Sequence, residues 1–218
     1  MKLSPGACAV IDGTMARHPD LELCRPDIAA AIQMIVGAYA SNRKVLTVGN
    51  GGSSADADHI VGELMKRFAR SRPLSQDVRR RIVGTEMRAD LKNRMLGGLE
   101  QPLPAINLTT HTALTTAFIN DADVELVYAQ ALLGFAEEGD VLVALSTSGN
   151  SANIVAAASL AKALGVGIVS LTGANGGRLA ELADVVIRVP AEVTAEVQEY
   201  HLPVYHCICG ACEAQFFD

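Results

Sequence analysis

Two helix-spaced sets of polar side chains lie far apart in this sequence. His59 and Glu63 are four residues apart, and Gln198 and His206 are eight residues apart. Residues at i and i+4 share one face of a helix, and eight residues make slightly more than two turns. If the fold brings both segments together, the set can transfer protons, bind a metal ion, or do both. Taken singly, a surface ion pair explains His59 and Glu63, and a buried core histidine explains His206.

A hydroxyl-rich loop lies between these two sets. Residues 146–151 read Ser-Thr-Ser-Gly-Asn-Ser, after a valine-rich stretch and at the start of an alanine-rich helix expected over 150–164. A bound phosphate needs several hydroxyl donors and the free N–H groups of a helix N-terminus. An ordinary helix N-cap needs only one hydroxyl. We therefore interpret this loop as a phosphate-binding site.

A second loop, at residues 50–53, reads Asn-Gly-Gly-Ser and also follows an apolar stretch. Its two glycines allow a tight turn with inward-facing N–H groups. A plain connection between a strand and a helix explains the loop equally well. Ligands bind at the carboxyl ends of parallel strands, and both loops are expected there.

Valine-rich stretches alternate with helical patterns along the chain. This predicts the α/β class, with a five-stranded parallel sheet flanked by helices in three Rossmann-like layers. The expected strands are 44–49, 104–109, 140–145, 167–171 and 184–189. Besides 150–164, the expected helices are 26–41, 53–69 and 193–216. No internal repeat or linker divides the 218 residues, so we expect one domain over 1–218.

The charge of the chain is concentrated in one segment. Residues 66–94 hold ten basic and three acidic residues, a net charge of +7, and the rest of the chain carries −13. Apolar residues at every fourth position from Val83 to Leu99 predict a helix that ends at Gly97 and Gly98. Its basic face indicates a solvated or intersubunit helix; the alternative is a rim that attracts an anionic substrate.

Composition excludes several classes of protein. The acidic body and the 4% aromatic content without tryptophan argue against nucleic-acid binding. No apolar run approaches the roughly 20 residues of a membrane span, and no signal peptide is apparent. Five cysteines, an odd number, indicate a reducing cytoplasmic location. Cys207, Cys209 and Cys212 lack the paired Cys-x-x-Cys spacing of a zinc site, which favours small core thiols.

Four stretches of the chain resemble the SIS (sugar isomerase) domain family, and within it the phosphoheptose isomerases. These are residues 48–63, 120–121, 146–153 and 197–206. The serine-rich loop marks the superfamily. The Asn-Gly-Gly-Ser loop with His59 and Glu63, together with Gln198 and His206, is specific to the isomerases. The resemblance covers nearly the whole chain and implies a single SIS domain.

The resemblance implies an aldose–ketose isomerase that converts sedoheptulose 7-phosphate to D-glycero-D-manno-heptose 7-phosphate through an ene-diol, towards activated heptose and lipopolysaccharide. Glu63 and His206 would be its acid–base pair. One zinc ion per subunit would be held by His59, Glu63, Gln198 and His206. The substrate would contact Asn50, Gly51, Gly52, Ser53, Asp121, Ser146, Thr147, Ser148, Ser151 and Gln198. The family forms homotetramers with active sites between subunits, and neither nucleic acid nor membrane is an expected partner.

Two features depart from the family pattern. The basic segment at about 72–102 is longer than its family counterpart by roughly two dozen residues, which we interpret as a helical insertion. Pro203 lies between Gln198 and His206, where it removes one backbone hydrogen bond and should kink the last helix. The alternatives are an isomerase of another sugar phosphate, a non-catalytic sugar-phosphate sensor, or a binding protein that associates with a replication initiator. The presence of both Glu63 and His206 argues against the last.

Overall fold

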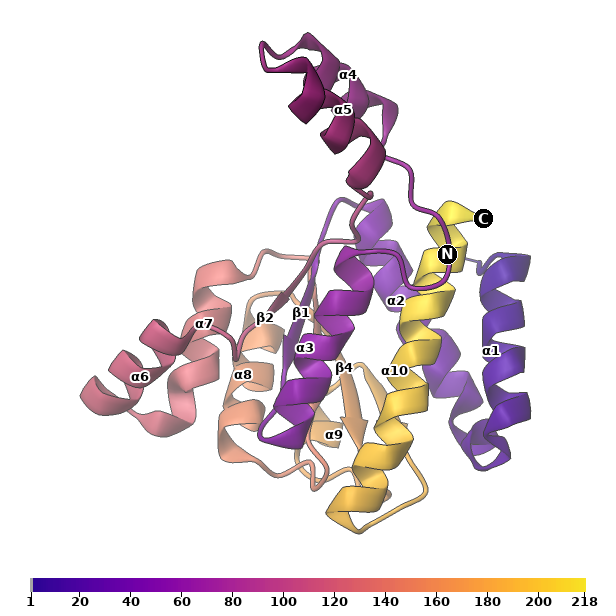
Figure 1. Cartoon of the computed structure of the whole chain (residues 1–218). Helices are drawn as coiled ribbons and strands as arrows, with labels where there is room; N and C mark the ends of the chain where they lie inside the picture. Colours follow the sequence, from indigo (N-terminus) through magenta and orange to yellow (C-terminus); the bar gives the residue numbers. More distant parts are fainter. Residues whose placement is uncertain (1) are drawn as a thin grey trace.

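The computed structural model describes residues 2–218 and places a five-stranded parallel sheet at the centre of the molecule (Figure 1). The strands are β1 (Val45–Val48), β2 (Ala105–Asn107), β3 (Val141–Leu145), β4 (Gly167–Thr172) and β5 (Val185–Arg188). Their order in the sheet is β2-β1-β3-β4-β5. Each strand lies within its predicted range except β4, which is one residue longer. The predicted fold class is confirmed.

Helices and short 3-10 turns connect and cover these strands. They are α1 (Pro5–Arg17), η1 (Pro19–Cys24), α2 (Arg25–Ala40), α3 (Gly52–Met65), α4 (Gln76–Gly84), α5 (Ala89–Gly98), α6 (Thr112–Asp121), η2 (Val124–Leu126), α7 (Val127–Phe135), α8 (Ala152–Ala163), α9 (Leu179–Leu182) and α10 (Thr194–Phe217). The sequence patterns predicted α2, α3, α8 and α10 but missed α1, α6, α7 and the short α9. The start of α1 carries a recognisable signal, because the Ser4 hydroxyl accepts a hydrogen bond from the Ala7 N–H and Pro5 occupies the first turn.

Side chains of the strands alternate between two hydrophobic cores, as the pleat of a sheet requires. On β3, Val141, Val143 and Leu145 face the core formed with α1, α2, α3 and α10. Leu142 and Ala144 face the opposite core, formed with α7, α8 and α9. Because both faces are covered, the strands are apolar along their whole length, and the predicted three-layer arrangement is confirmed.

The predicted helix over 53–69 is too long. The helix α3 ends at Met65, and Lys66 adopts an extended backbone conformation. Phe68, which fitted the helical pattern, instead donates its backbone N–H to the Glu213 carboxylate of α10 at 2.7 Å. A tertiary hydrogen bond therefore replaces the next helical turn.

The predicted helix that ends at Gly97 and Gly98 is confirmed as α5, but the apolar pattern that begins at Val83 does not form one continuous helix. The segment forms two helices, α4 and α5, that contact each other and project away from the sheet layers (Figure 1). The break follows Gly84, where Thr85 is extended and both its N–H and its hydroxyl donate to the Arg81 carbonyl. We call residues 75–99 the α4–α5 hairpin; none of them is buried.

The last helix, α10, runs as one element from Thr194 to Phe217 and contains Pro203. It packs against α1, α2 and α3 (Figure 1). Across residues 2–218, no helix combines the length and the apolar character needed to cross a membrane.

Candidate functional site

The serine loop (residues 146–151) joins β3 to α8, where the sequence placed it. Ser146 Oγ and Ser151 Oγ lie 3.1 Å apart, and the Ser148 hydroxyl accepts a hydrogen bond from the Asn150 N–H at 3.2 Å. Ser146 is buried and Ser148 is exposed. Buried and exposed hydroxyls therefore both lie around the N-terminus of α8. This geometry is suited to binding an anion.

Gly149 allows the serine loop to pass close to a neighbouring loop. Its φ angle is +65°, and an added Cβ would lie 1.9 Å from the Gly176 carbonyl oxygen. Only glycine fits this backbone conformation and this spacing. Asn150 also links the serine loop to the neighbouring segment, because its side-chain oxygen accepts a hydrogen bond from the Arg178 N–H at 3.0 Å. The loop is thus held in a fixed shape.

The second predicted loop, at residues 50–53, joins β1 to α3. Gly51 has a φ angle of +52°, and Ser53 is buried in the first turn of α3. A Cβ on Gly52 would lie 2.7 Å from the amide nitrogen of Gln198. The Gln198 side chain of α10 therefore packs directly against the N-terminus of α3.

A pair of asparagines links the two loops. Asn50 Nδ2 donates to Asn153 Oδ1 at 2.8 Å, and Asn153 Nδ2 donates back to Asn50 Oδ1 at 3.1 Å. Sequence reasoning assigned no role to Asn153, although it lies in the first turn of α8 after the serine loop. This reciprocal amide pair fixes the spacing of the two loops at the carboxyl ends of β1 and β3.

The two remaining predicted substrate contacts lie in different parts of the structure. Thr147 is half-buried in the serine loop, and its carbonyl accepts the Gly173 N–H at 3.0 Å. Asp121 is exposed at the last residue of α6, where it accepts a hydrogen bond from the Asn120 side chain at 2.7 Å. The structure therefore groups the loop residues and Gln198 but leaves Asp121 on a peripheral helix.

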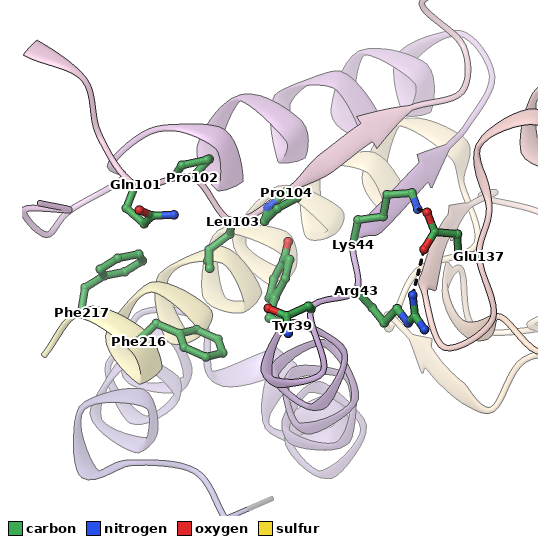
Figure 2. Close-up of a pocket in the computed structure, with 11 residues that line it drawn as sticks. Tyr39, Arg43, Lys44, Gln101, Pro102, Leu103, Pro104, Glu137, Phe216 and Phe217 are labelled. Carbon is green, nitrogen blue, oxygen red and sulfur yellow. Dashed lines mark hydrogen bonds and ion pairs between the residues drawn. The ribbon is translucent and has the colours of Figure 1, made fainter. Parts of the chain in front are cut away.

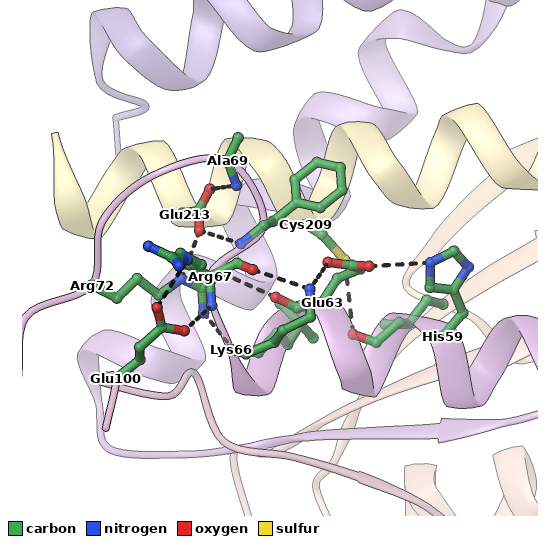
Figure 3. Close-up of polar contacts among 12 residues, drawn as sticks. His59, Glu63, Lys66, Arg67, Ala69, Arg72, Glu100, Cys209 and Glu213 are labelled. Atoms are coloured by element: carbon green, nitrogen blue, oxygen red, sulfur yellow. Dashed lines mark hydrogen bonds and ion pairs between the residues drawn. The ribbon is translucent and has the colours of Figure 1, made fainter. Parts of the chain in front are cut away.

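His59, Glu63 and His206 come together further along α3 and α10. His59 Nε2 lies 3.2 Å from Glu63 Oε1, and Lys66 Nζ donates to Glu63 Oε2 at 2.9 Å (Figure 3). The rings of His59 and His206 are 5.1 Å apart and nearly perpendicular. The side chain of Glu63 is only 13% exposed. The i, i+4 prediction is confirmed, whereas Lys66 was not anticipated.

His59 is also engaged at its other nitrogen. Tyr205 Oη lies 2.9 Å from His59 Nδ1 and donates to Asp56 Oδ1 at 3.2 Å. Burial raises the pKa of both Asp56 and Tyr205. Sequence reasoning missed both groups, although Asp56 lies one turn before His59 and Tyr205 immediately precedes His206. The network fixes the orientation of the His59 ring. This orientation keeps His59 Nε2 in contact with Glu63.

His206 offers an unengaged nitrogen. Its Nε2 is buried and has no hydrogen-bond partner within residues 2–218, and its ring lies 5.3 Å from that of Phe68. Burial, together with the neighbouring His59, lowers the pKa of His206. A neutral imidazole with a free nitrogen can exchange protons with a substrate hydroxyl or bind a metal.

The four predicted zinc ligands are not assembled within one chain. In the described part of the chain, no three acidic, imidazole or thiol side chains converge on a common metal position. His59 has both nitrogens engaged, and Gln198 lies eight residues, or about 12 Å, before His206 along α10. The donor types nevertheless suit zinc, and His206 Nε2, which has no partner in the described part of the chain, is available to bind it.

The candidate site thus has two halves at different levels of α3. Ser53 and the Gln198 contact are at the start of the helix, and Glu63 is ten residues further on. A rise of 1.5 Å per residue separates them by about 15 Å. One half suits a phosphate and the other suits proton transfer.

A separate groove of about 510 Å³ lies at the amino ends of the strands (Figure 2). It is lined by aromatic and basic side chains, among them Tyr39, Phe216 and Lys44. Its charged groups pair with one another: Arg43 Nη1 lies 2.8 Å from a Glu137 oxygen, and Lys44 Nζ lies 3.4 Å from the other. Because the groove lies at the amino ends of the strands and the two loops lie at the carboxyl ends, the groove is not part of the candidate site.

The SIS domain family matches two parts of this chain, residues 21–95 and 108–204. Phosphoheptose isomerase of Halorhodospira halophila is 38% identical over 209 residues, which cover 94% of this chain and 91% of that protein. Phosphoheptose isomerase of Rhodospirillum rubrum is 37% identical over 190 residues, covering 87% and 86%.

Solved structures give the same result. The structure of phosphoheptose isomerase from Neisseria gonorrhoeae matches with a TM-score of 0.72 and 28% identity, covering 94% of this chain and 96% of that one. A phosphoheptose isomerase from Francisella tularensis matches with the same TM-score and identity, over 91% of both chains. Sequence and fold thus point to the same group of proteins.

Proposed function

Because this chain belongs to the phosphoheptose isomerase family of SIS-domain proteins, we propose that it converts sedoheptulose 7-phosphate to D-glycero-D-manno-heptose 7-phosphate. The observation that carries the proposal is the grouping of Glu63, His59 and His206 on two adjacent helices of the family fold. A carboxylate and a neutral imidazole in a partly buried setting are the groups that aldose–ketose isomerisation needs.

The phosphate binds in the serine loop. The hydroxyls of Ser146, Ser148 and Ser151 and the N-terminal N–H groups of α8 supply donors, and Ser53 adds one from α3. The amide pair of Asn50 and Asn153 holds the two loops at a fixed spacing. Gly51, Gly52, Thr147, Gln198 and Asp121 complete the proposed set of sugar contacts.

Two proton transfers balance the reaction. Glu63 removes a proton from C1 of the ketose and returns it to C2. His206 accepts the proton of the O1 hydroxyl and delivers it to O2, so that an ene-diol connects ketose and aldose. His59 acts as a positioning residue, because its Nε2 contacts one carboxylate oxygen of Glu63 while Lys66 contacts the other.

We propose further that the working form is a homotetramer with sites shared between copies. The 15 Å estimate above separates the two halves of one chain's site, which favours completion by another copy. None of the residues 112–121 of α6 is buried, and Leu114 and Ile119 are exposed on it. Light scattering should give four chains per particle. At substrate concentrations below KM, mixed Glu63→Gln and Ser146→Ala chains should be more active than either variant alone; a fully active monomer would contradict the proposal.

Zinc is part of the proposal, with His59, Glu63, Gln198 and His206 as its ligands. The supporting observation is the buried Nε2 of His206, which has no hydrogen-bond partner among residues 2–218 and lies beside a histidine. When bound, the ion would supply Lewis-acid polarisation of the substrate carbonyl. Elemental analysis of the purified oligomer should give one zinc per chain, lost in His206→Gln; equal zinc in both proteins would exclude this residue as a ligand.

We also propose a cytoplasmic location and a role in making activated heptose, for lipopolysaccharide among other products. The five cysteines of the described chain are unpaired, which suits a reducing compartment. The product is an aldose phosphate, so the next reaction must act on its anomeric carbon or on its phosphate.

The direct test is proton NMR of sedoheptulose 7-phosphate with the purified oligomer in D₂O, with and without zinc. We expect aldoheptose anomeric signals and deuterium at the carbon that receives the proton. Parallel samples with other ketose phosphates measure specificity. A folded, zinc-supplied oligomer that converts none of them would replace the enzyme proposal by a binding role.

A further inference from the structure

We propose that Arg72 and Glu213 form a clamp that sets the position of Glu63 relative to His206 and thereby controls turnover rather than substrate affinity. The inference deepens the proposed isomerase function and rests on it. Both residues are positioning residues, because neither belongs to the two halves of the site. The evidence is a set of hydrogen bonds made by two fully buried charged side chains.

The clamp connects the helix of one proposed proton carrier to the helix of the other. Arg72 Nε lies 2.7 Å from Glu213 Oε1, and both side chains have no exposed surface. Glu213 lies on α10 seven residues, about two turns, beyond His206. Arg72 follows α3, the helix of Glu63. The ion pair therefore fixes α3 against α10 close to both groups.

Arg72 holds the backbone of Glu63 itself. Its Nη2 donates to the Glu63 carbonyl at 3.0 Å, and its Nη1 donates to the Leu64 carbonyl at 2.6 Å. These carbonyls belong to the last turn of α3, where no further helical N–H is available to them. A positive charge at this end is also favoured by the helix dipole. The guanidinium thus ends the helix and fixes the residue that carries the proposed base.

Glu213 holds the segment that follows α3. Its carboxylate accepts backbone N–H groups of Phe68 and Ala69 at 2.7 Å and of Arg70 at 2.9 Å (Figure 3). Phe68 in turn packs against the His206 ring. Burial acts to raise the pKa of Glu213, but these N–H groups and Arg72 outweigh it and lower the pKa. The carboxylate therefore stays charged at neutral pH.

A purely structural ion pair and a positioning clamp should respond differently when both charges are replaced by apolar side chains. Buried ion pairs are often replaceable by apolar side chains of similar volume with little loss of stability, whereas removing one partner leaves an uncompensated charge. The double variant Arg72→Met/Glu213→Leu removes both charges. It also removes the Arg72 donors to the Glu63 and Leu64 carbonyls, of which only Leu64 keeps a second donor, the Leu103 N–H. Thermal unfolding of the same variant measures stability, so a loss of kcat without a loss of stability is assigned to positioning.

The test compares kcat and KM of this double variant with those of the wild-type oligomer. We expect kcat to fall about 10- to 100-fold, because small displacements of a catalytic group cost rate, while KM stays within about threefold. Arg72→Lys keeps the buried charge but has a single nitrogen; it should also lose kcat, and it carries the test if the double variant does not fold. Arg25→Met is the matched control. It removes an arginine bound to Asp12 and Glu22 at the surface and should leave kcat unchanged.

A second readout does not depend on turnover. The NMR chemical shifts of the His206 ring protons report the surroundings of this imidazole directly. We expect these shifts to change in the double variant and in Arg72→Lys, because the Phe68 ring, 5.3 Å from that of His206, packs less closely. An unchanged kcat, or unchanged His206 shifts, in a folded variant would overturn the clamp. Absence of turnover in the wild type would instead overturn the proposed function, and the chemical shifts would still test the clamp.

Discussion

His59 Nε2 lies 3.2 Å from Glu63 Oε1, and its other nitrogen lies 2.9 Å from Tyr205 Oη. The histidine therefore links the proposed base on α3 to a tyrosine on α10. Tyr205 donates its single phenolic proton to Asp56 Oδ1, so its oxygen accepts a hydrogen bond from His59 Nδ1. Both ring nitrogens of His59 are therefore held by side chains, which fixes the ring in one orientation against Glu63.

Replacing Glu63 with glutamine should abolish proton abstraction at carbon. We expect kcat to fall about 10²- to 10⁴-fold, the usual contribution of a general base, with KM changed little. Steady-state kinetics with sedoheptulose 7-phosphate checks this. The exposed Glu138, changed to glutamine, serves as the control. Retained activity in Glu63→Gln would reject the base assignment.

Replacing Ser148 with alanine should weaken binding of the phosphate. A hydrogen bond to a charged group is worth about 1.5–3 kcal/mol, so we expect KM to rise about 10- to 100-fold while kcat changes little. Ser159→Ala is the matched control, because this α8 serine donates to the Val155 carbonyl within its own helix. If the two variants show the same KM, the phosphate does not contact Ser148.

Replacing Tyr205 with phenylalanine should release His59 and Asp56 from their common partner. Only the hydroxyl is lost, so the fold should persist, while kcat falls about tenfold because His59 no longer orients Glu63. Kinetics and thermal unfolding together check this. Tyr200→Phe removes a comparable hydroxyl, bonded to Asp20 at 3.1 Å on the surface, and should have no effect. Equal kcat in both variants would remove Tyr205 from the mechanism.

Acid should destabilise the fold partly through His201. This side chain is fully buried, and burial lowers its pKa from 6.5 to about 4. The unfolded chain therefore binds the extra proton first, so stability present above pH 6.5 is lost as the pH falls towards 4. The loss amounts to about 3 kcal/mol.

Urea unfolding of the wild type and of His201→Leu at pH 7 and pH 4.5 measures this contribution. The leucine variant should lose less free energy of unfolding between the two pH values. Glu213 also titrates at acidic pH, but it is present in both proteins, and its lowered pKa places its loss at the acidic end of the range. Identical pH dependence in the two proteins would show that His201 does not titrate on unfolding.

The sequence by itself determined the strand segments and the two loops. Valine-rich stretches such as 140–145 mark buried strands, and Gly51 and Gly149 mark turns whose φ angles other residues rarely adopt. The His59–Glu63 pair follows from helical spacing alone. These features depend on neighbours within about one helical turn, and local sequence records such neighbours directly.

Only the tertiary structure decided how the two helices meet. The bonds of Tyr205 to Asp56 and of Glu213 to Arg72 join residues more than 140 positions apart. The packing of α10 on α3 places Gln198 beside Gly52 but His206 beside His59, which separates the predicted zinc ligands within one chain. Likewise, α3 stops at Met65, where Arg72 binds the last carbonyls of the helix and Glu213 binds the backbone N–H groups that follow it. Such contacts depend on side chains from distant segments competing for the same backbone groups, and no local pattern encodes that competition.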